Sequence, residues 1–154
     1  MSAKGILQAI WIAPEKGAPM ISVPEALAMA GQGLFGDRNF ARQAGPGSDK
    51  DVTLIEAEQI AGFVAATGLP FTAADARRNF VTSGIDLNPL LGREFVVGEV
   101  RVQALELCQP CSLLAKRTHR AVLWALRDRG GLRCRILCGG VIRVGDGVGA
   151  EEGL

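Results

Sequence analysis

Apolar and polar residues alternate along several short stretches of this chain, as they do in strands that bury one face. The longest such stretch is Val100–Leu107, and Leu132–Cys138 alternates in the same way. Other stretches are rich in β-forming residues and are separated by glycine- or proline-containing turns. These are Ile6–Ile12, Pro19–Val23, Val52–Ile55, Ala76–Thr82, Arg93–Val97 and Val141–Val144. The pattern predicts about seven or eight short strands.

A few segments follow a helical pattern instead. Glu56–Val64 is amphipathic, with glutamates in its first turn, and Ala121–Arg129 is followed by a pair of glycines. Glu25–Ala30 contains good helix formers, and Ser112–Arg117 is predicted to open another helix. Residues 44–49 have the composition of a flexible loop. Because strands and helices do not alternate, we expect a mainly β, barrel-like fold with two or three short helices.

The size and composition limit the classes of function. A chain of 154 residues, 48% apolar and 21% charged, fits a single globular domain over residues 1–154. The net charge of +1 gives no general attraction to nucleic acid or to an anionic membrane. No apolar run approaches the roughly 20 residues of a membrane span, and the N-terminus lacks a signal-peptide pattern. We therefore expect a cytoplasmic protein that binds neither membranes nor nucleic acid.

Cys111 is the most reactive candidate in the sequence. Pro110 should end the strand that precedes it, and a helix is predicted to begin at Ser112. Cys111 would then lie at a strand-to-helix corner, near backbone N–H groups that favour a thiolate. Such a cysteine is a candidate nucleophile, persulfide carrier or soft-metal ligand. A half-buried structural cysteine is the alternative.

The four cysteines also raise the alternative of a structural zinc site. Cys108 and Cys111 form one close pair, and Cys134 and Cys138 form a second. However, the second pair shares one face of a predicted strand, roughly 13 Å apart, which is too far for one zinc ion unless the strand breaks. A thioredoxin-like Cys-x-x-Cys needs an alternating α/β pattern, which is absent. The single histidine, His119, has no evident partner cysteine.

Two polar segments are candidates for a binding site. Gly33–Phe40 contains glycines followed by Asp37 and Arg38, an arrangement that suits either a surface turn or close approach to a ligand. Arg77 and Arg78 should enter a strand, where neighbouring side chains point to opposite faces. At most one of these two arginines is therefore expected to line a given pocket.

Six separate pieces of the sequence, taken together, resemble the MOSC domain, which is named for the C-terminal domain of molybdenum cofactor sulfurase. The pieces occur in one order along the chain. They are Lys16–Met20 after Pro14, Gly33–Arg38, Arg77–Val81 with Gly84–Leu87, Leu91–Gly92 leading to Val97–Gly98, Cys108–Cys111, and Arg135–Leu137 with Gly139–Asp146.

The resemblance implies a barrel-like β fold with Cys111 as the functional cysteine. In some family members this cysteine ligates molybdenum in the molybdenum cofactor (molybdopterin), and the protein is an oxidoreductase that reduces N-hydroxylated small molecules. In other members this cysteine carries sulfur as a persulfide, and the protein acts as a sulfur transferase in metal-sulfur or molybdenum cofactor maturation. Both roles use the same thiolate, so both are kept as alternatives.

The resemblance also implies roles for polar residues and partners. Molybdopterin ends in a phosphate, which makes Arg38, Arg77, Asn79 and Arg135 candidate anchors, with Asp37 orienting Arg38. The chain is close to a bare domain, so electrons for a reductase would come from a separate electron-transfer protein. The chain lacks a lysine motif for pyridoxal phosphate. Pyridoxal phosphate would therefore be bound by a partner cysteine desulfurase. Cys134 and Cys138 lie outside the family pattern.

Overall fold

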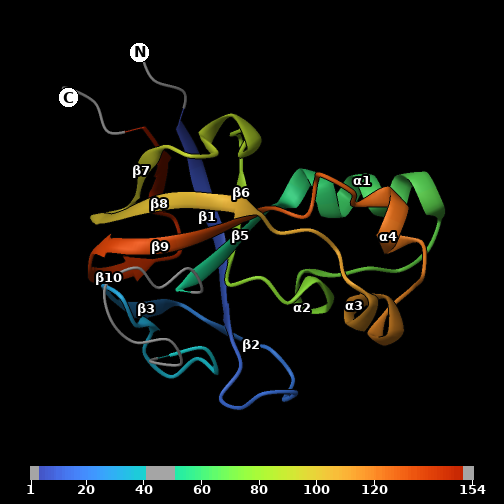
Figure 1. Cartoon of the computed structure of the whole chain (residues 1–154), viewed down its shortest axis with the longest axis horizontal. Helices are drawn as coiled ribbons and strands as arrows, with labels where there is room; N and C mark the ends of the chain where they lie inside the picture. The colour runs from blue at the N-terminus through green and yellow to red at the C-terminus, as the bar shows by residue number, and fades with distance from the viewer. Residues whose placement is uncertain (1–3, 41–50, 151–154) are drawn as a thin grey trace.

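The structure, a computed structural model, describes residues 4–40 and 51–150 (Figure 1). Its strands are β1 Lys4–Ile12, β2 Ile21–Val23, β3 Glu25–Met29, β4 Gly33–Leu34, β5 Val52–Glu56, β6 Phe80–Ser83, β7 Glu94–Val97, β8 Val100–Leu107, β9 Leu132–Cys138, β10 Gly140–Arg143 and β11 Gly147–Gly149. Its helices are α1 Ala57–Thr67, α2 Ala73–Ala76, the 3-10 helix η1 Asn88–Leu90, α3 Ser112–Arg117 and α4 Val122–Ala125.

Seven strands of the described residues close into a barrel in the order β11-β7-β8-β9-β5-β6-β1. The barrel closes where β1 pairs with β11, with Lys4 opposite Gly149. Closure leaves these strands without a free edge. The far end of β1 also pairs with β2, and β10, β3 and β4 form a separate small sheet. The predicted mainly β, barrel-like fold with a few short helices is confirmed.

One pair of barrel strands is parallel and requires a long connection. β5 and β6 run side by side in the same direction, whereas the other pairs of the barrel are antiparallel. A parallel pair cannot be joined by a tight turn, and α1 and α2 make the crossover here. Figure 1 shows α1, α3 and α4 together on one side of the barrel. These helices build a second layer on the outside of β5 and β6.

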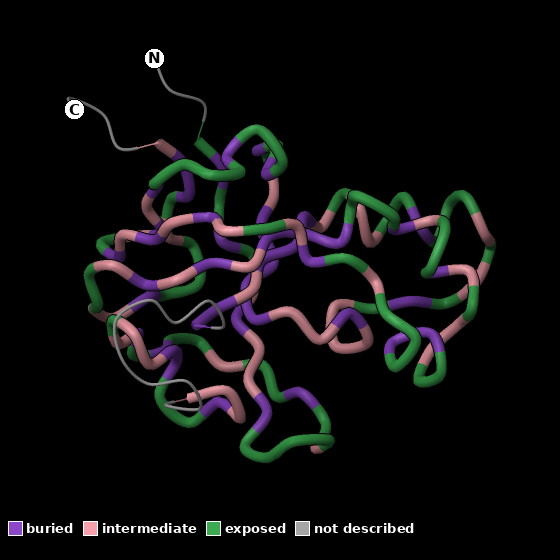
Figure 2. Tube along the Cα trace, in the orientation of Figure 1, coloured by how far each residue is buried: buried purple, intermediate pink, exposed green. Residues whose placement is uncertain are grey.

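Each layer has its own core. Inside the barrel, Leu7, Ile10, Leu54 and Phe80 have no exposed surface, and Figure 2 shows the buried residues following the strands. A second apolar cluster joins the helices to the outer face of the barrel. It contains Ile55, Phe63, Phe71, Ala76, Val81, Leu114, Ala115, Val122 and Leu126. Burial of β5 on both faces explains why its sequence is apolar without clear alternation.

Two helix predictions were wrong in extent or type. Residues 25–29 form strand β3, which pairs with β10 and buries Ala26 and Ala28 on one face. Pairing with a neighbouring strand outweighs the helix propensity of Glu, Ala, Leu and Met there. In the predicted helix 121–129 only Val122–Ala125 is α-helical, and Asp128 adopts a left-handed conformation (φ 61°) through which a helix does not continue. The loop predicted at residues 44–49 lies outside the described residues.

The segment before β6 also differs from its prediction. Thr72 and Asp75 form a reciprocal capping box that starts the short helix α2, and Arg77 ends it in a left-handed conformation (φ 57°, ψ 33°). The strand expected from Ala76 therefore begins only at Phe80. In the part of the chain that the structure describes, no helix is long and apolar enough to span a membrane.

Candidate functional site

A cavity of about 250 Å³ gathers polar side chains from four separated segments of the chain. These segments are the turn after β1, the turn after β4, the turn between α2 and β6, and the start of α3. The lining residues are Lys16, Gly17, Arg38, Asn39, Arg77, Arg78, Cys111, Leu113, Leu114 and Arg117. Five of them are cationic and none is acidic, so the cavity suits an anionic ligand.

Cys111 lies at the strand-to-helix corner that the sequence predicts. β8 ends at Leu107, α3 begins at Ser112, and the Cys111 backbone between them is extended (φ −121°, ψ 170°). Its thiol is free, and the residue is exposed. Since α3 has only six residues, the macrodipole contributes little to this site. The cations that share the cavity with Cys111 are therefore the main source of positive potential for an anionic ligand there.

Arg38 is held in place by its neighbour in the turn. Its Nη1 donates a hydrogen bond to Asp37 Oδ1 at 3.0 Å, within an ion pair that is single rather than bidentate. Asp37 is buried and also accepts hydrogen bonds from the backbone N–H groups of Ala13 (3.0 Å) and Asn39 (3.3 Å). The Asp37 carboxylate thus orients Arg38, as the resemblance implies, and it also caps the turn through its bonds to backbone N–H groups.

Arg77 reaches the cavity from a strained backbone position. A left-handed conformation is unusual for a residue with a side chain and is tolerated where the surroundings enforce it. The Arg77 Nη1 donates to the carbonyl oxygen of Ala18 at 2.9 Å. Burial and the nearby charges of Arg38 and Arg117 lower the pKa of Arg77, and Asp37 opposes this shift. These cations repel one another, and a bound anion would relieve that repulsion.

Arg78 lines the same cavity but has a structural function. It donates three hydrogen bonds to carbonyl oxygens, those of Gly130 (3.0 Å), Ala76 (3.0 Å) and Cys108 (3.1 Å). These bonds fix the start of the segment that leads to Cys111. The expectation that only one of the two adjacent arginines would line a pocket was wrong, because they lie in a turn rather than in a strand.

A second cavity of about 250 Å³ adjoins the first. Both are lined by Arg38, Asn39, Arg77 and Arg78, and Thr53, Cys108 and Arg133 complete the second. Arg133 donates to Glu106 Oε1 at 3.0 Å and lies 3.9 Å from Cys108 Sγ. Burial lowers the pKa of Arg133, but its interactions and hydrogen bonds with Cys108 and Glu106 outweigh this and raise the pKa. The cationic surface therefore continues from Cys111 to Arg133.

Two of the predicted anchors are not among the residues that line these cavities. The Asn79 side chain is 1% exposed, donates to the carbonyl of Trp11 (3.0 Å) and accepts from the Thr53 N–H (3.1 Å). Asn79 thus joins β1, β5 and β6. Arg135 lies on β9 opposite Gln103, two positions beyond Arg133 on the same face. Of the two β9 arginines, Arg133 is the one that lines the second cavity.

The sequence reasoning missed Lys16 and Arg117 as cavity residues. Lys16 stands in one of the family-like pieces, but no role was assigned to it. Arg117 lies three positions after Leu114, and residues with this spacing share one face of a helix. Both line the cavity with Cys111. The spacing within Ser112–Arg117 was the signal that would have identified Arg117.

The zinc alternative is contradicted. Cys108 and Cys134 are buried, whereas Cys111 and Cys138 are exposed. Within residues 4–40 and 51–150, no three His, Cys, Asp or Glu side chains are grouped so that they could hold a metal ion. Burial, with a smaller contribution from Cys108, strongly raises the pKa of the Cys134 thiol. Cys134 is therefore an inert core residue at neutral pH.

Comparisons with known proteins agree with this architecture. The family model of the MOSC domain matches residues 34–149. The crystal structure of the YuaD protein from Bacillus subtilis superposes with a TM-score of 0.82 at 15% identity, covering 99% of each chain.

Two structures of the protein YiiM are also similar in fold. YiiM from Geobacillus stearothermophilus gives a TM-score of 0.72 at 23% identity, covering 97% of this chain and 77% of its own. YiiM from Escherichia coli gives 0.70 at 18% identity, covering 100% of this chain and 71% of its own. No curated protein matches the sequence. At these identities the structural similarity concerns the fold alone.

Proposed function

This chain belongs to the MOSC domain family, and from that premise we propose that it binds a molybdenum cofactor at Cys111 and reduces N-hydroxylated small molecules. One observation carries the proposal. An exposed free thiol shares a cavity with five cationic side chains, and none of the described lining residues is acidic. A thiolate is a soft ligand suited to a metal such as molybdenum, and guanidinium groups suit a phosphate.

The residues present fit the two ends of such a cofactor. Cys111 would hold the metal, and Arg38 and Arg77 would bind the phosphate from the shared wall of the two cavities. In the role that the sequence suggested for Arg135, we propose Arg133, which lines the second cavity. When bound, the cofactor supplies the two-electron chemistry that removes oxygen from the substrate nitrogen.

The protein's own contribution is to preorganise this site. Asp37 fixes Arg38, the Ala18 carbonyl fixes Arg77, and Arg78 holds the chain that leads to Cys111. Groups held in this way do not need to reorganise when an anion binds, which strengthens their electrostatic effect. Leu113 and Leu114 add apolar surface to the cavity beside Cys111, against which the apolar part of a small substrate could pack.

A sulfur-carrier function is the second candidate. The observation that favours it is that the Cys111 thiol is exposed and unpaired, so a partner protein could reach it. The same cations would stabilise a persulfide anion. The sulfur would then come from a separate cysteine desulfurase, which would carry the pyridoxal phosphate.

Metal analysis combined with intact mass distinguishes these functions. Wild type, Cys111→Ala and Cys138→Ala would be purified from a host that makes molybdenum cofactor. Cys138→Ala is the matched control because it removes the other exposed thiol. We expect near-stoichiometric molybdenum in wild type and Cys138→Ala, its loss in Cys111→Ala, and reduction of a hydroxylamine substrate by the loaded protein only. A reducible mass gain of about 32 Da on Cys111 without molybdenum would instead establish the sulfur carrier.

A further inference from the structure

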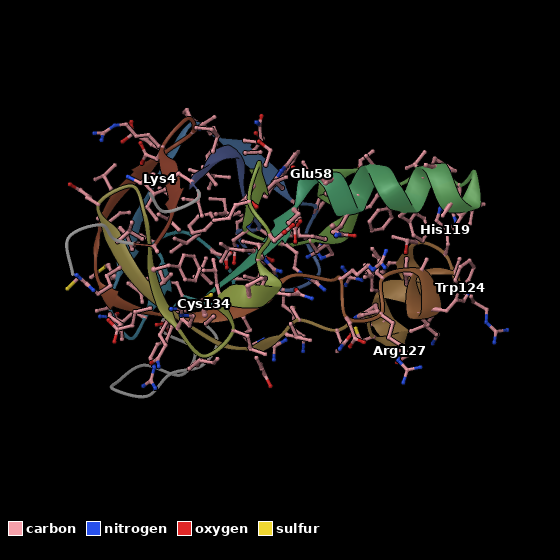
Figure 3. The ribbon with its side chains drawn as sticks, turned by 90° about the horizontal axis from the view of Figure 1, so that it is seen from above. Lys4, Glu58, His119, Trp124, Arg127 and Cys134 are labelled. Atoms are coloured by element: carbon pink, nitrogen blue, oxygen red, sulfur yellow. The ribbon has the colours of Figure 1, made fainter. Side chains whose placement is uncertain are left out.

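The segment 112–129, which contains α3 and α4, presents an exposed surface that is both basic and apolar. We call it the α3–α4 face. Figure 3 shows Trp124 at the outer end of this helical part, far from the barrel, and Arg127 on the lower side of the same part in this view. The face consists of Leu113, Lys116, Arg117, Arg120, Leu123, Trp124, Arg127 and Arg129, all of which are exposed.

The apolar members of the face are unusually accessible for their size. Trp124 is 67% exposed, Leu113 54% and Leu123 41%. Isolated exposed leucines are common on proteins, but a tryptophan that is 67% exposed is not explained by packing within the chain. Tryptophan contributes strongly to binding energy when a partner buries it. The three side chains therefore mark a contact surface.

The charges of the α3–α4 face determine which charge a partner surface should carry. Segment 112–129 contains five basic residues and a single acidic one, Asp128, although the whole chain has a net charge of only +1. The Asp128 carboxylate accepts a hydrogen bond from Gln109 Nε2 at 2.6 Å. Two such faces would repel each other, which disfavours a second copy of this chain. An acidic surface is complementary to it.

The position of the face connects it to the site. Leu113 and Arg117 belong to the face and also line the cavity that contains Cys111. A protein bound to the α3–α4 face would therefore cover or border the opening of that cavity.

We propose that the α3–α4 face docks an acidic electron-carrier protein that delivers electrons to the site at Cys111. This inference rests on the proposed reductase function. Reduction of a hydroxylamine, R–NHOH + 2e⁻ + 2H⁺ → R–NH₂ + H₂O, breaks the N–O bond and consumes two electrons, which an electron carrier docked on this face would supply. The reduced carrier is oxidised in the same exchange, and the protons come from water.

Direct binding tests the surface independently of catalysis. The probe is oxidised flavodoxin, an acidic flavin protein, titrated calorimetrically at low and at high salt against wild type, Trp124→Ala and Arg120→Glu/Arg127→Glu. We expect wild type to bind flavodoxin with an affinity that decreases at high salt. The affinity of both variants should be about tenfold or more lower than that of wild type. The control is Arg143→Glu, an exposed cation on β10, which Figure 1 shows far from α4. Its affinity should stay within about twofold of wild type.

Several outcomes would overturn the docking proposal. They are no flavodoxin binding by wild type, equal binding by wild type and the face variants, or binding by wild type to phosphatidylglycerol vesicles but not to flavodoxin. Thermal melting of each variant checks that it is folded.

Turnover with a reduced viologen dye separates this proposal from the proposed function, because a dye needs no docking surface. Loaded wild type and face variants should reduce hydroxylamine equally with the dye, whereas the variants should be slower with flavodoxin. Failure of wild type with the dye would refute the reductase function. Equal rates with flavodoxin in wild type and variants would refute the docking surface.

Discussion

Arg38 donates a hydrogen bond from Nη2 to the backbone carbonyl oxygen of Arg77, at 3.3 Å. The two residues are far apart in the sequence, yet both side chains line the two adjoining cavities. This bond ties the turn after β4 to the left-handed residue that ends α2. The spacing of the two guanidinium groups therefore depends on how firmly Arg38 is held, and Asp37 holds it.

Asp37→Ala should lower the free energy of unfolding by about 3 kcal/mol, because it leaves Arg38 partly buried without its anion and removes an acceptor from the Ala13 N–H. Urea denaturation would measure this. The control is Glu94→Ala, which breaks the exposed ion pair with Arg101 and should cost less than about 1 kcal/mol. Equal losses in the two variants would show that Asp37 is no stronger an anchor than a surface carboxylate.

Asn79→Ala should reduce stability rather than cofactor binding. It removes the partner of the Thr53 N–H and of the Trp11 carbonyl in a buried region, which we expect to cost about 2 kcal/mol. Molybdenum content per folded molecule should remain that of wild type, whereas Arg77→Gln should lower it. Thermal melting and metal analysis of the same samples would measure both. Loss of molybdenum from a fully stable Asn79→Ala protein would instead identify Asn79 as an anchor.

Gly131→Ala should destabilise the protein strongly. Gly131 has a φ of +98°, and an added Cβ would collide with the Leu54 carbonyl oxygen. Its own carbonyl accepts a hydrogen bond from the Cys108 N–H at 2.8 Å, so the change would also disturb the segment that leads to Cys111. We expect a loss of more than about 3 kcal/mol in urea denaturation.

Gly62→Ala is the matched control for that substitution. Gly62 lies within α1, and a Cβ there would meet no atom within 4 Å. Alanine favours a helix interior over glycine, so this variant should gain about 0.5 to 1 kcal/mol. A similar loss in both glycine variants would mean that backbone freedom, and not the close approach to Leu54, determines the effect.

The Cys134 thiol should make the protein less stable at alkaline pH. Burial raises its pKa in the folded state well above the ordinary value of 9.0, so only the unfolded chain releases this proton just above pH 9. The stabilisation is complete below the unfolded pKa and is lost as pH rises toward the folded pKa, by about 1.4 kcal/mol per pH unit. Urea denaturation at several pH values should show this slope in wild type and in Cys138→Ala. Cys134→Ala should lack it.

The sequence by itself determined the local elements whose pattern agrees with their final surroundings. β8 and β9 occupy the predicted ranges, and α1 covers the predicted amphipathic segment. Alternation and amphipathic spacing record directly which face of an element is buried, so they can be read without knowing the partner. The corner at Cys111 followed in the same way, because Pro110 cannot continue a ladder of hydrogen bonds.

Only the tertiary structure decided which polar residues meet. The resemblance made Asn79 and Arg135 candidate anchors. The structure shows that Asn79 joins three strands and that Arg133, two positions from Arg135, lines the second cavity. The fate of residues 25–29 likewise depended on β10, more than a hundred residues later. Closure of the barrel brings distant turns together, and the side chain that points into the resulting cavity depends on the conformation of each turn. Local sequence does not encode that conformation.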